Sequence, residues 1–166
     1  ADISSLPAIS EYLPEVVNAR KINGKLYYMP VASNALGAIY NKKVFKDLGL
    51  AIPQNIDDFT AALDKIKAAG IIPIGGGFKD AWITQIIPFI AVGQYVMSKD
   101  DKALEKLWNG TTKWSSPEFK KAIQLQLDFA HKGYFLENYL GSDVSVAGGM
   151  VANGKAAMLI VGNWQY

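Results

Sequence analysis

The chain has 166 residues, of which 50% are hydrophobic and 19% are charged, the balance of an ordinary globular domain. Its net charge of +2 comes from lysines scattered beside acids, which gives no basic patch for nucleic acid. Because the chain has no cysteine, disulfides, thiolate metal sites and CxxC redox chemistry are excluded.

The first part of the sequence predicts an interrupted helix, two strands and a short helix. Apolar residues recur at helical intervals over residues 4–20, where Pro14 marks an interruption. Residues 25–30 predict a strand after an Asn-Gly turn. The continuous apolar run over residues 35–41 predicts a second strand, buried on both faces, and residues 42–48 predict a short helix closed by glycine.

The next helix has clear signals at both ends. Asn55 is placed to cap it, and Asp57 and Asp58 suit its positive N-terminal end. Gly70 ends it. The spacing of apolar residues predicts one buried face, formed by Phe59, Ala62, Leu63 and Ile66.

A short strand and a run of three glycines follow. Residues 71–74 predict a buried strand, and residues 75–77 allow a tight turn into a helix that begins near Asp80. The longest apolar stretch, residues 81–97, is interrupted by polar residues and by Pro88. It falls short of the roughly 20 apolar residues that a membrane-spanning helix needs, so we interpret it as a buried helix.

The last third predicts three helices and a strand. A helix over residues 100–108 is expected to turn its leucines and tryptophan inward, and a second begins at the capping-box pair Ser115 and Glu118. Residues 143–153 predict a glycine-rich helix, and residues 156–161 an apolar strand. Strands that alternate with helices indicate an α/β layer architecture with a largely parallel sheet. The second helix shows an apolar stripe of Phe119, Ile123, Leu127 and Ala130.

Motifs that suggest catalysis or cofactors have simpler explanations. Residues 149–155 spell GMVANGK, but Ala156 replaces the hydroxyl of a phosphate-binding loop, and the segment leads from a helix into a strand. His131, the sole histidine, fits the negative C-terminal end of a helix. Adjacent acids such as Asp100 and Asp101 point about 100° apart on a helix and do not form a facing carboxylate pair. We therefore expect no catalytic site, no metal and no cofactor.

Three aromatic residues lie in glycine-rich or polar surroundings at the ends of predicted elements. They are Trp82, Trp164 and Tyr166. Sugar rings pack their C–H faces on aromatic faces, while their hydroxyls bond to neighbouring polar side chains. The residues alone leave two interpretations open, because large aromatic side chains also pack in protein cores.

Several motifs occur together along the chain. GKLYYMPV is followed by ALGAIYNKKVFKDLGL and by the helix entry PQNIDDF, and the chain closes with GKAAM and GNW. With these motifs the chain resembles the bacterial extracellular solute-binding proteins of family 1, the carbohydrate-type receptors of ABC importers, over essentially all of its length.

The resemblance implies a fold and a division of the chain. The fold is an α/β, periplasmic-binding-protein-like type II lobe with a largely parallel sheet flanked by helices. It is incomplete relative to the two-lobe family fold, in which ligand binds between lobes that close by hinge motion. Residues 1–32 correspond to the tail of the first lobe, residues 33–37 to a hinge crossing strand, and residues 38–166 to most of the second lobe.

The resemblance also implies a function without catalysis. The chain is expected to be part of the extracytoplasmic substrate-binding component of an ABC importer, which binds a sugar or oligosaccharide in an interlobe cleft. The ligand-binding residues carried over from the family are Asn34, Asp80, Trp82, Trp164 and Tyr166. Two alternatives are a lobe of a carbohydrate-active enzyme, which needs two facing carboxylates, and an interaction module without ligand.

Partners and location follow from the same resemblance. The expected partners are a carbohydrate solute and a membrane-embedded ABC permease, with no nucleic acid. The surface left by the missing lobe is expected to drive self-association. The expected location is the periplasm or the outer face of the cytoplasmic membrane, and a lipid anchor stays open as an alternative.

Overall fold

A computed structural model describes residues 1–165 of the chain. It divides into two compact units, Ala1–Ala35 and Leu36–Tyr166. The boundary falls within residues 33–37. Each unit is described by itself below.

The first unit contains two short helices, each opened by a proline. They are the 3₁₀ helix η1 (Pro7–Glu11) and α1 (Pro14–Asn18). The helix expected over residues 4–20 is therefore divided where Pro14 begins the second piece, because proline is favoured in a first turn and disrupts a helix interior. Val17 and Leu26 are buried and supply the apolar centre of this small unit.

The strand expected over residues 25–30 is wrong. In this unit the extended backbone forms only an isolated bridge between Ile22 and Lys25. The turn between them has positive φ at Asn23 (52°) and Gly24 (76°), the geometry that favours Asn-Gly. A strand needs a ladder of backbone bonds to a neighbour. Leu26 accepts a single bond, from the Ile3 amide at 2.8 Å, and no ladder forms over residues 26–30.

The second unit is built on a three-stranded sheet with the order β1-β3-β2. The strands are β1 (Leu36–Tyr40), β2 (Ile72–Ile74) and β3 (Ala156–Gly162). The central strand β3 pairs with β1 in the antiparallel direction, with Leu36 opposite Gly162, and with β2 in the parallel direction.

The α/β class is confirmed, but the expectation of a largely parallel sheet is wrong, since one pair of strands is antiparallel. An apolar strand can be buried beside a parallel or an antiparallel neighbour, so the composition of β1 did not determine the direction of its pairing with β3. Burial on both faces of β1 is also wrong. Leu36, Gly37 and Ala38 are exposed, because β1 lies at the edge of the sheet.

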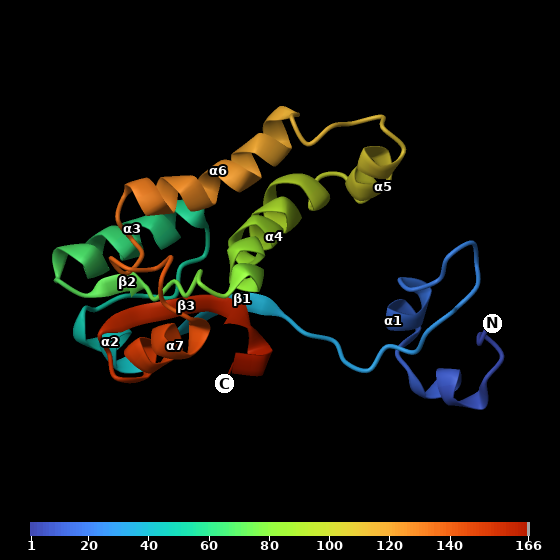
Figure 1. Ribbon diagram of the computed structural model, residues 1–166, viewed down its shortest axis with the longest axis horizontal. Helices are drawn as coiled ribbons and strands as arrows, with labels where there is room; N and C mark the ends of the chain where they lie inside the picture. The colour runs from blue at the N-terminus through green and yellow to red at the C-terminus, as the bar shows by residue number, and fades with distance from the viewer. Residues whose placement is uncertain (166) are drawn as a thin grey trace. The chain divides into compact units, whose positions relative to one another are not determined.

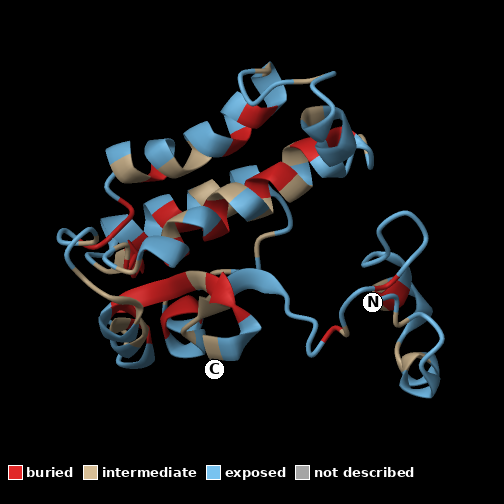
Figure 2. Cartoon of the chain, turned by 45° about the vertical axis from the view of Figure 1, so that its right-hand side comes forward, coloured by how far each residue is buried: buried red, intermediate tan, exposed pale blue. Residues whose placement is uncertain are grey.

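Helices cover both faces of the sheet in this unit. In Figure 1, α3, α4 and α6 lie on one side of the strands, and α2 and α7 lie on the other. Figure 2 shows buried residues along β3 and within the helices around it. The helices are α2 (Lys42–Asp47), α3 (Ile56–Ala68), η2 (Ala81–Gln85), α4 (Ile86–Val92), η3 (Gly93–Met97), α5 (Ala103–Trp108), α6 (Pro117–His131), α7 (Val144–Ala152) and η4 (Asn163–Gln165).

Helix α3 begins and packs as its sequence predicts. The Asn55 side chain accepts a hydrogen bond from the Asp58 amide at 2.9 Å, which caps the first turn. Three of the four predicted apolar residues are buried and the fourth, Phe59, is half-buried against the same cluster. The buried residues are Ala62, Leu63 and Ile66.

Helix α6 begins later than its capping signal predicts. Its N-cap is Ser116, whose hydroxyl donates to the Lys113 carbonyl and makes no capping bond, so the predicted capping box is wrong. Pro117 supplies the first-turn geometry instead. The predicted stripe is only partly buried, because Ile123 and Leu127 remain nearly half exposed.

The long apolar stretch forms three successive helical pieces. A 3₁₀ turn (η2), an α-helix (α4) and a π-helical turn (η3) replace the single helix expected over residues 81–97. Within residues 1–165, every helix is too short or too polar to cross a membrane.

Candidate functional site

The two predicted ligand-binding tryptophans lie at the same end of the sheet. The parallel strands β2 and β3 have their carboxyl ends at one edge. Trp82 follows β2 through the glycine turn and lies in η2, and Trp164 follows β3 directly and lies in η4. In open α/β sheets, the carboxyl ends of parallel strands are where ligands bind, since the loops there converge.

The two indoles form a pair. Their ring centroids are 6.1 Å apart and the ring planes are inclined by 49°. Trp82 is 38% exposed and Trp164 is 48% exposed, so neither ring is enclosed by the core. Within this unit the pair therefore presents aromatic surface to solvent, which is what sugar stacking requires.

A glycine makes room for one ring of the pair. A side chain at Gly162, the last residue of β3, would have its Cβ within 1.9 Å of the Trp164 ring. The indole thus folds back over the end of its own strand. Sequence reasoning did not single out Gly162 for this role, although the sequence Gly-Asn-Trp was the available signal.

The glycine turn after β2 is pressed against helix α7. A Cβ on Gly75 would lie 3.1 Å from Ala147, and a Cβ on Gly77 would lie 3.0 Å from the Val144 backbone. A side chain at either glycine would push the turn and the start of α7 apart, so glycine allows their close contact. The direction of the chain leading to Trp82 is fixed in this way.

Asp80 also links the segment after the glycine turn to the start of α7. Its Oδ2 accepts a hydrogen bond from the Val144 amide at 2.8 Å, and Asp143 Oδ1 accepts one from the Val146 amide at 2.9 Å. Both carboxylates satisfy amides in the first turn of α7, where negative charge is also favoured by the helix dipole. Asp80 therefore has a structural partner, and a ligand contact through its other oxygen is compatible with this bond.

Other candidate motifs lie where the sequence predicted. Residues 149–155 lead from the end of α7 into β3, the reverse of a phosphate-binding loop. His131 is exposed in the last turn of α6. Among residues 1–165, no three His, Asp or Glu side chains are grouped as metal ligands.

A family model for the bacterial extracellular solute-binding proteins matches residues 1–166. The chain belongs to this family. The extracellular solute-binding protein assignment fits the structural neighbours, which share the type II periplasmic sugar-binding fold.

Named relatives and solved structures are similar to this solute-binding protein. The Multiple sugar-binding protein of Streptococcus mutans is 29% identical over 150 residues, which is 89% of this chain and 36% of that protein. A chitin oligosaccharide binding protein has a TM-score of 0.78 and 26% identity, covering 89% of this chain and 36% of that one. The structure titled "SBP RafE in complex with raffinose" has a TM-score of 0.72 and 27% identity, covering 99% and 43%.

The chain spans about a third of the length of the curated relatives it matches. It is thus incomplete relative to the fold of its structural neighbours, of which it covers 36–43%.

Two of the five predicted ligand-binding residues have no described relationship to the tryptophan pair. Asn34 is exposed and belongs to the Ala1–Ala35 unit, whereas both tryptophans belong to the other unit. Tyr166 lies outside the described residues. The structure thus brings together Trp82 and Trp164, with Asp80 two residues before Trp82.

Proposed function

We propose that this chain is part of the substrate-binding component of an ABC importer and that its Leu36–Tyr166 unit contributes one wall of a sugar-binding cleft. The observation that carries the proposal is the half-exposed pair of Trp82 and Trp164 at the carboxyl ends of β2 and β3. Two inclined rings offer stacking surfaces for an oligosaccharide more readily than for an anionic solute, because the faces of aromatic rings are negative.

The remaining parts of the proposal rest on family membership. The ligand is a mono- or oligosaccharide, Asp80 and Asn34 supply hydrogen bonds to its hydroxyls, and Tyr166 adds a further aromatic contact. The receptor acts outside the cytoplasmic membrane, delivers its ligand to a permease and performs no catalysis. Relatives named for sugar binding support this substrate class. A lipid anchor belongs to the same proposal, as does self-association of the isolated chain through the surface left by the missing lobe.

A fluorescence titration tests this function. A protein of full family length is titrated with a panel of mono- and oligosaccharides while tryptophan emission is recorded. Replacing Trp164 by alanine removes one stacking face and is expected to weaken binding about 10-fold, with little change in stability. Trp108→Ala is the matched control, since Trp108 is 93% exposed at the end of α5, away from the strand ends.

The titration distinguishes a wrong binding site from a wrong substrate class. Binding that falls with Trp164→Ala and persists with Trp108→Ala supports the site. An unchanged dissociation constant for Trp164→Ala rejects the site, and no response to any saccharide in the panel rejects the substrate class.

A further inference from the structure

The ring of Trp164 has a neighbour on β1 as well as on η2. The Cβ position of Gly162 is taken by the benzo ring of Trp164, with Cζ3 at 1.9 Å and Cη2 at 2.1 Å. Leu36, the first residue of β1, lies directly opposite Gly162 in the antiparallel ladder. Because directly opposite residues turn their side chains to the same face of a sheet, Leu36 and the indole lie on one face.

The register of the ladder brings these two side chains close together. The Asn41 amide donates to the Ala157 carbonyl at 2.8 Å, so Asn41 and Ala157 form a hydrogen-bonded pair. Hydrogen-bonded and non-hydrogen-bonded pairs alternate along an antiparallel ladder, which makes Leu36 and Gly162 a non-hydrogen-bonded pair. In such pairs the Cβ positions are separated by the short end of a range of about 4.5–5.5 Å. The Leu36 side chain therefore reaches the edge of the Trp164 ring.

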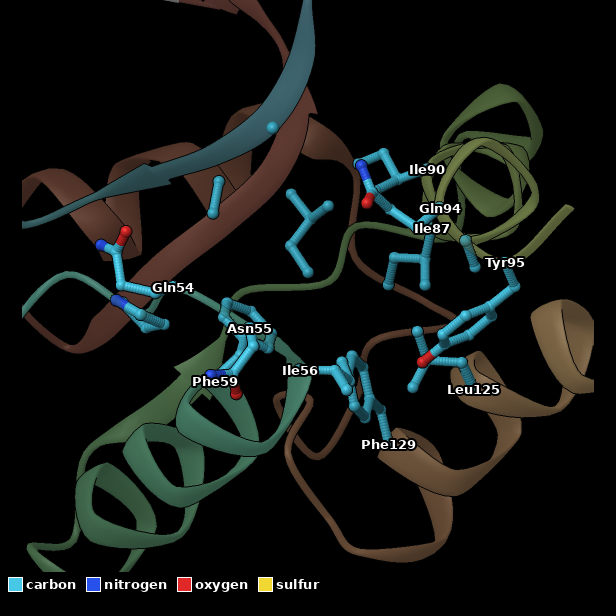
Figure 3. A pocket seen from close by; sticks show the side chains of 15 residues that line it. Gln54, Asn55, Ile56, Phe59, Ile87, Ile90, Gln94, Tyr95, Leu125 and Phe129 are labelled. Atoms are coloured by element: carbon cyan, nitrogen blue, oxygen red, sulfur yellow. The ribbon is translucent and has the colours of Figure 1, made fainter. Parts of the chain in front are cut away.

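The face of β1 that carries Leu36 also meets helix α4. Ala38 shares this face and lines an apolar groove together with its partner Ile160 on β3. Figure 3 shows Ile90 of α4 at the same groove. Helix α4 follows η2, the turn that contains Trp82. The second indole therefore approaches the sheet from the face on which Leu36 lies.

Few side chains of the sheet are placed to hold the Trp164 ring. The ring is 48% exposed, and η4, the short turn that carries it, lies against β1. Gly37, the next residue of β1, has no side chain, and Ala38 lies opposite Ile160, one pair further along the same face. Leu36 is thus the side chain of β1 that limits the movement of the indole.

We propose that Leu36 is a positioning residue for the sugar-stacking tryptophan. Its side chain packs on the Trp164 ring and holds it beside Trp82, and it acts on binding through the ring and not through a contact with the ligand. An aliphatic side chain suits this place, because it contacts an indole without competing for the hydroxyls of a sugar. The effect on sugar binding rests on the proposed function, whereas the position of the ring does not.

Circular dichroism of chain 1–166 tests the position of the ring. The exciton signal between the two indoles is recorded for the wild type, Leu36→Ala and Leu36→Met. Leu36→Ala removes the packing atoms and is expected to reduce the signal to less than about half, whereas Leu36→Met conserves the volume and should retain it. Ile52→Ala is the matched control, since Ile52 is an aliphatic residue, 51% exposed, between α2 and α3.

The control separates a direct contact from a general loosening of the fold. An undiminished signal in Leu36→Ala overturns the proposal. An equal loss in Ile52→Ala also overturns it, because the loss would then not come from the contact with Trp164. Should Leu36→Ala fail to fold, Leu36→Val, which is smaller than leucine by one carbon, is compared with Leu36→Met in the same way.

A sugar titration of a protein of full family length tests the effect on binding. Leu36→Ala is expected to raise the dissociation constant about 5-fold, and Leu36→Met to leave it within about 2-fold of the wild type. A lost exciton signal with unchanged affinity in Leu36→Ala overturns the proposal, because the position of the ring would not matter to the ligand. A wild type that binds no saccharide rejects the proposed function instead, while circular dichroism still decides whether Leu36 positions Trp164.

Discussion

The indole of Trp164 occupies the space that a side chain at Gly162 would need. Three ring atoms lie 1.9, 2.1 and 2.3 Å from the position of a Cβ there, far inside contact distance. The centroid of the same ring lies 6.1 Å from the centroid of the Trp82 ring. The absence of a side chain at Gly162 therefore allows the Trp164 ring to take its place in the aromatic pair.

Gly162→Ala is expected to separate the two indoles. The new methyl group must displace the Trp164 ring, at a cost of about 1–3 kcal/mol where the ring cannot move freely. Circular dichroism detects the change as a loss of the exciton signal between the two indoles. Gly148→Ala is the control, since a Cβ there meets nothing within 4 Å. An exciton signal that survives Gly162→Ala contradicts the prediction.

Gly76→Ala should destabilise the protein more than Gly70→Ala. Both glycines have positive φ, 78° and 76°, so both substitutions carry the backbone strain of about 1 kcal/mol. Only at Gly76 does the new Cβ also meet a close neighbour, the Tyr139 Cβ at 2.8 Å. Urea denaturation of the two variants measures the difference, and equal losses of unfolding free energy would show that Tyr139 moves aside without cost.

Signals from residues close together in the sequence correctly predicted the start and the buried face of α3. The Asn55 cap and the buried face of α3 follow from neighbouring residues, and the structure contains both. The strand expected over 25–30 failed because pairing depends on a distant partner. Trp108 was expected to face inward, but it is exposed where α5 ends, because apolar spacing does not reveal whether another element covers that side.

The candidate site was predictable only in part. Glycine-rich surroundings marked Trp82 and Trp164, and the strand order that places them together came only from the structure. The bond from the Val144 amide to Asp80 joins residues 64 positions apart and has no sequence signal. The apolar groove lined by residues of β1, β3, α3, α4, η3 and α6 was also missed, because no single one of these elements marks it in the sequence.

Asp80→Ala is expected to destabilise the protein even without ligand. It removes the acceptor of the Val144 amide at the start of α7, which should cost about 1–2 kcal/mol of unfolding free energy. Asp80→Asn retains an acceptor oxygen and should cost less. Urea denaturation measures both, with Asp101→Ala as the control at an exposed acid. If Asp80→Ala leaves stability unchanged and weakens only sugar binding, the helix-start role is wrong.

Tyr134→Phe should change how stability depends on pH. The buried Tyr134 hydroxyl donates to Asp64 Oδ1 at 2.6 Å, and burial together with this bond raises the pKa of the phenol well above its ordinary value. At pH 7 the loss of the bond should cost about 1 kcal/mol. Above pH 10 the unfolded tyrosine ionises while the native one stays protonated, so the wild type loses about 1.4 kcal/mol per pH unit through this group.

The advantage of the wild type over Tyr134→Phe should therefore shrink above pH 10 and vanish near pH 11, at about 1.4 kcal/mol per pH unit. Urea denaturation of both proteins at pH 7, 9, 10 and 11 measures the difference, in which the other tyrosines cancel. Tyr28→Phe controls for the loss of a half-exposed hydroxyl at pH 7. A difference that stays constant from pH 7 to pH 11 would mean that the native phenol ionises as readily as the unfolded one, against the burial and the Asp64 bond.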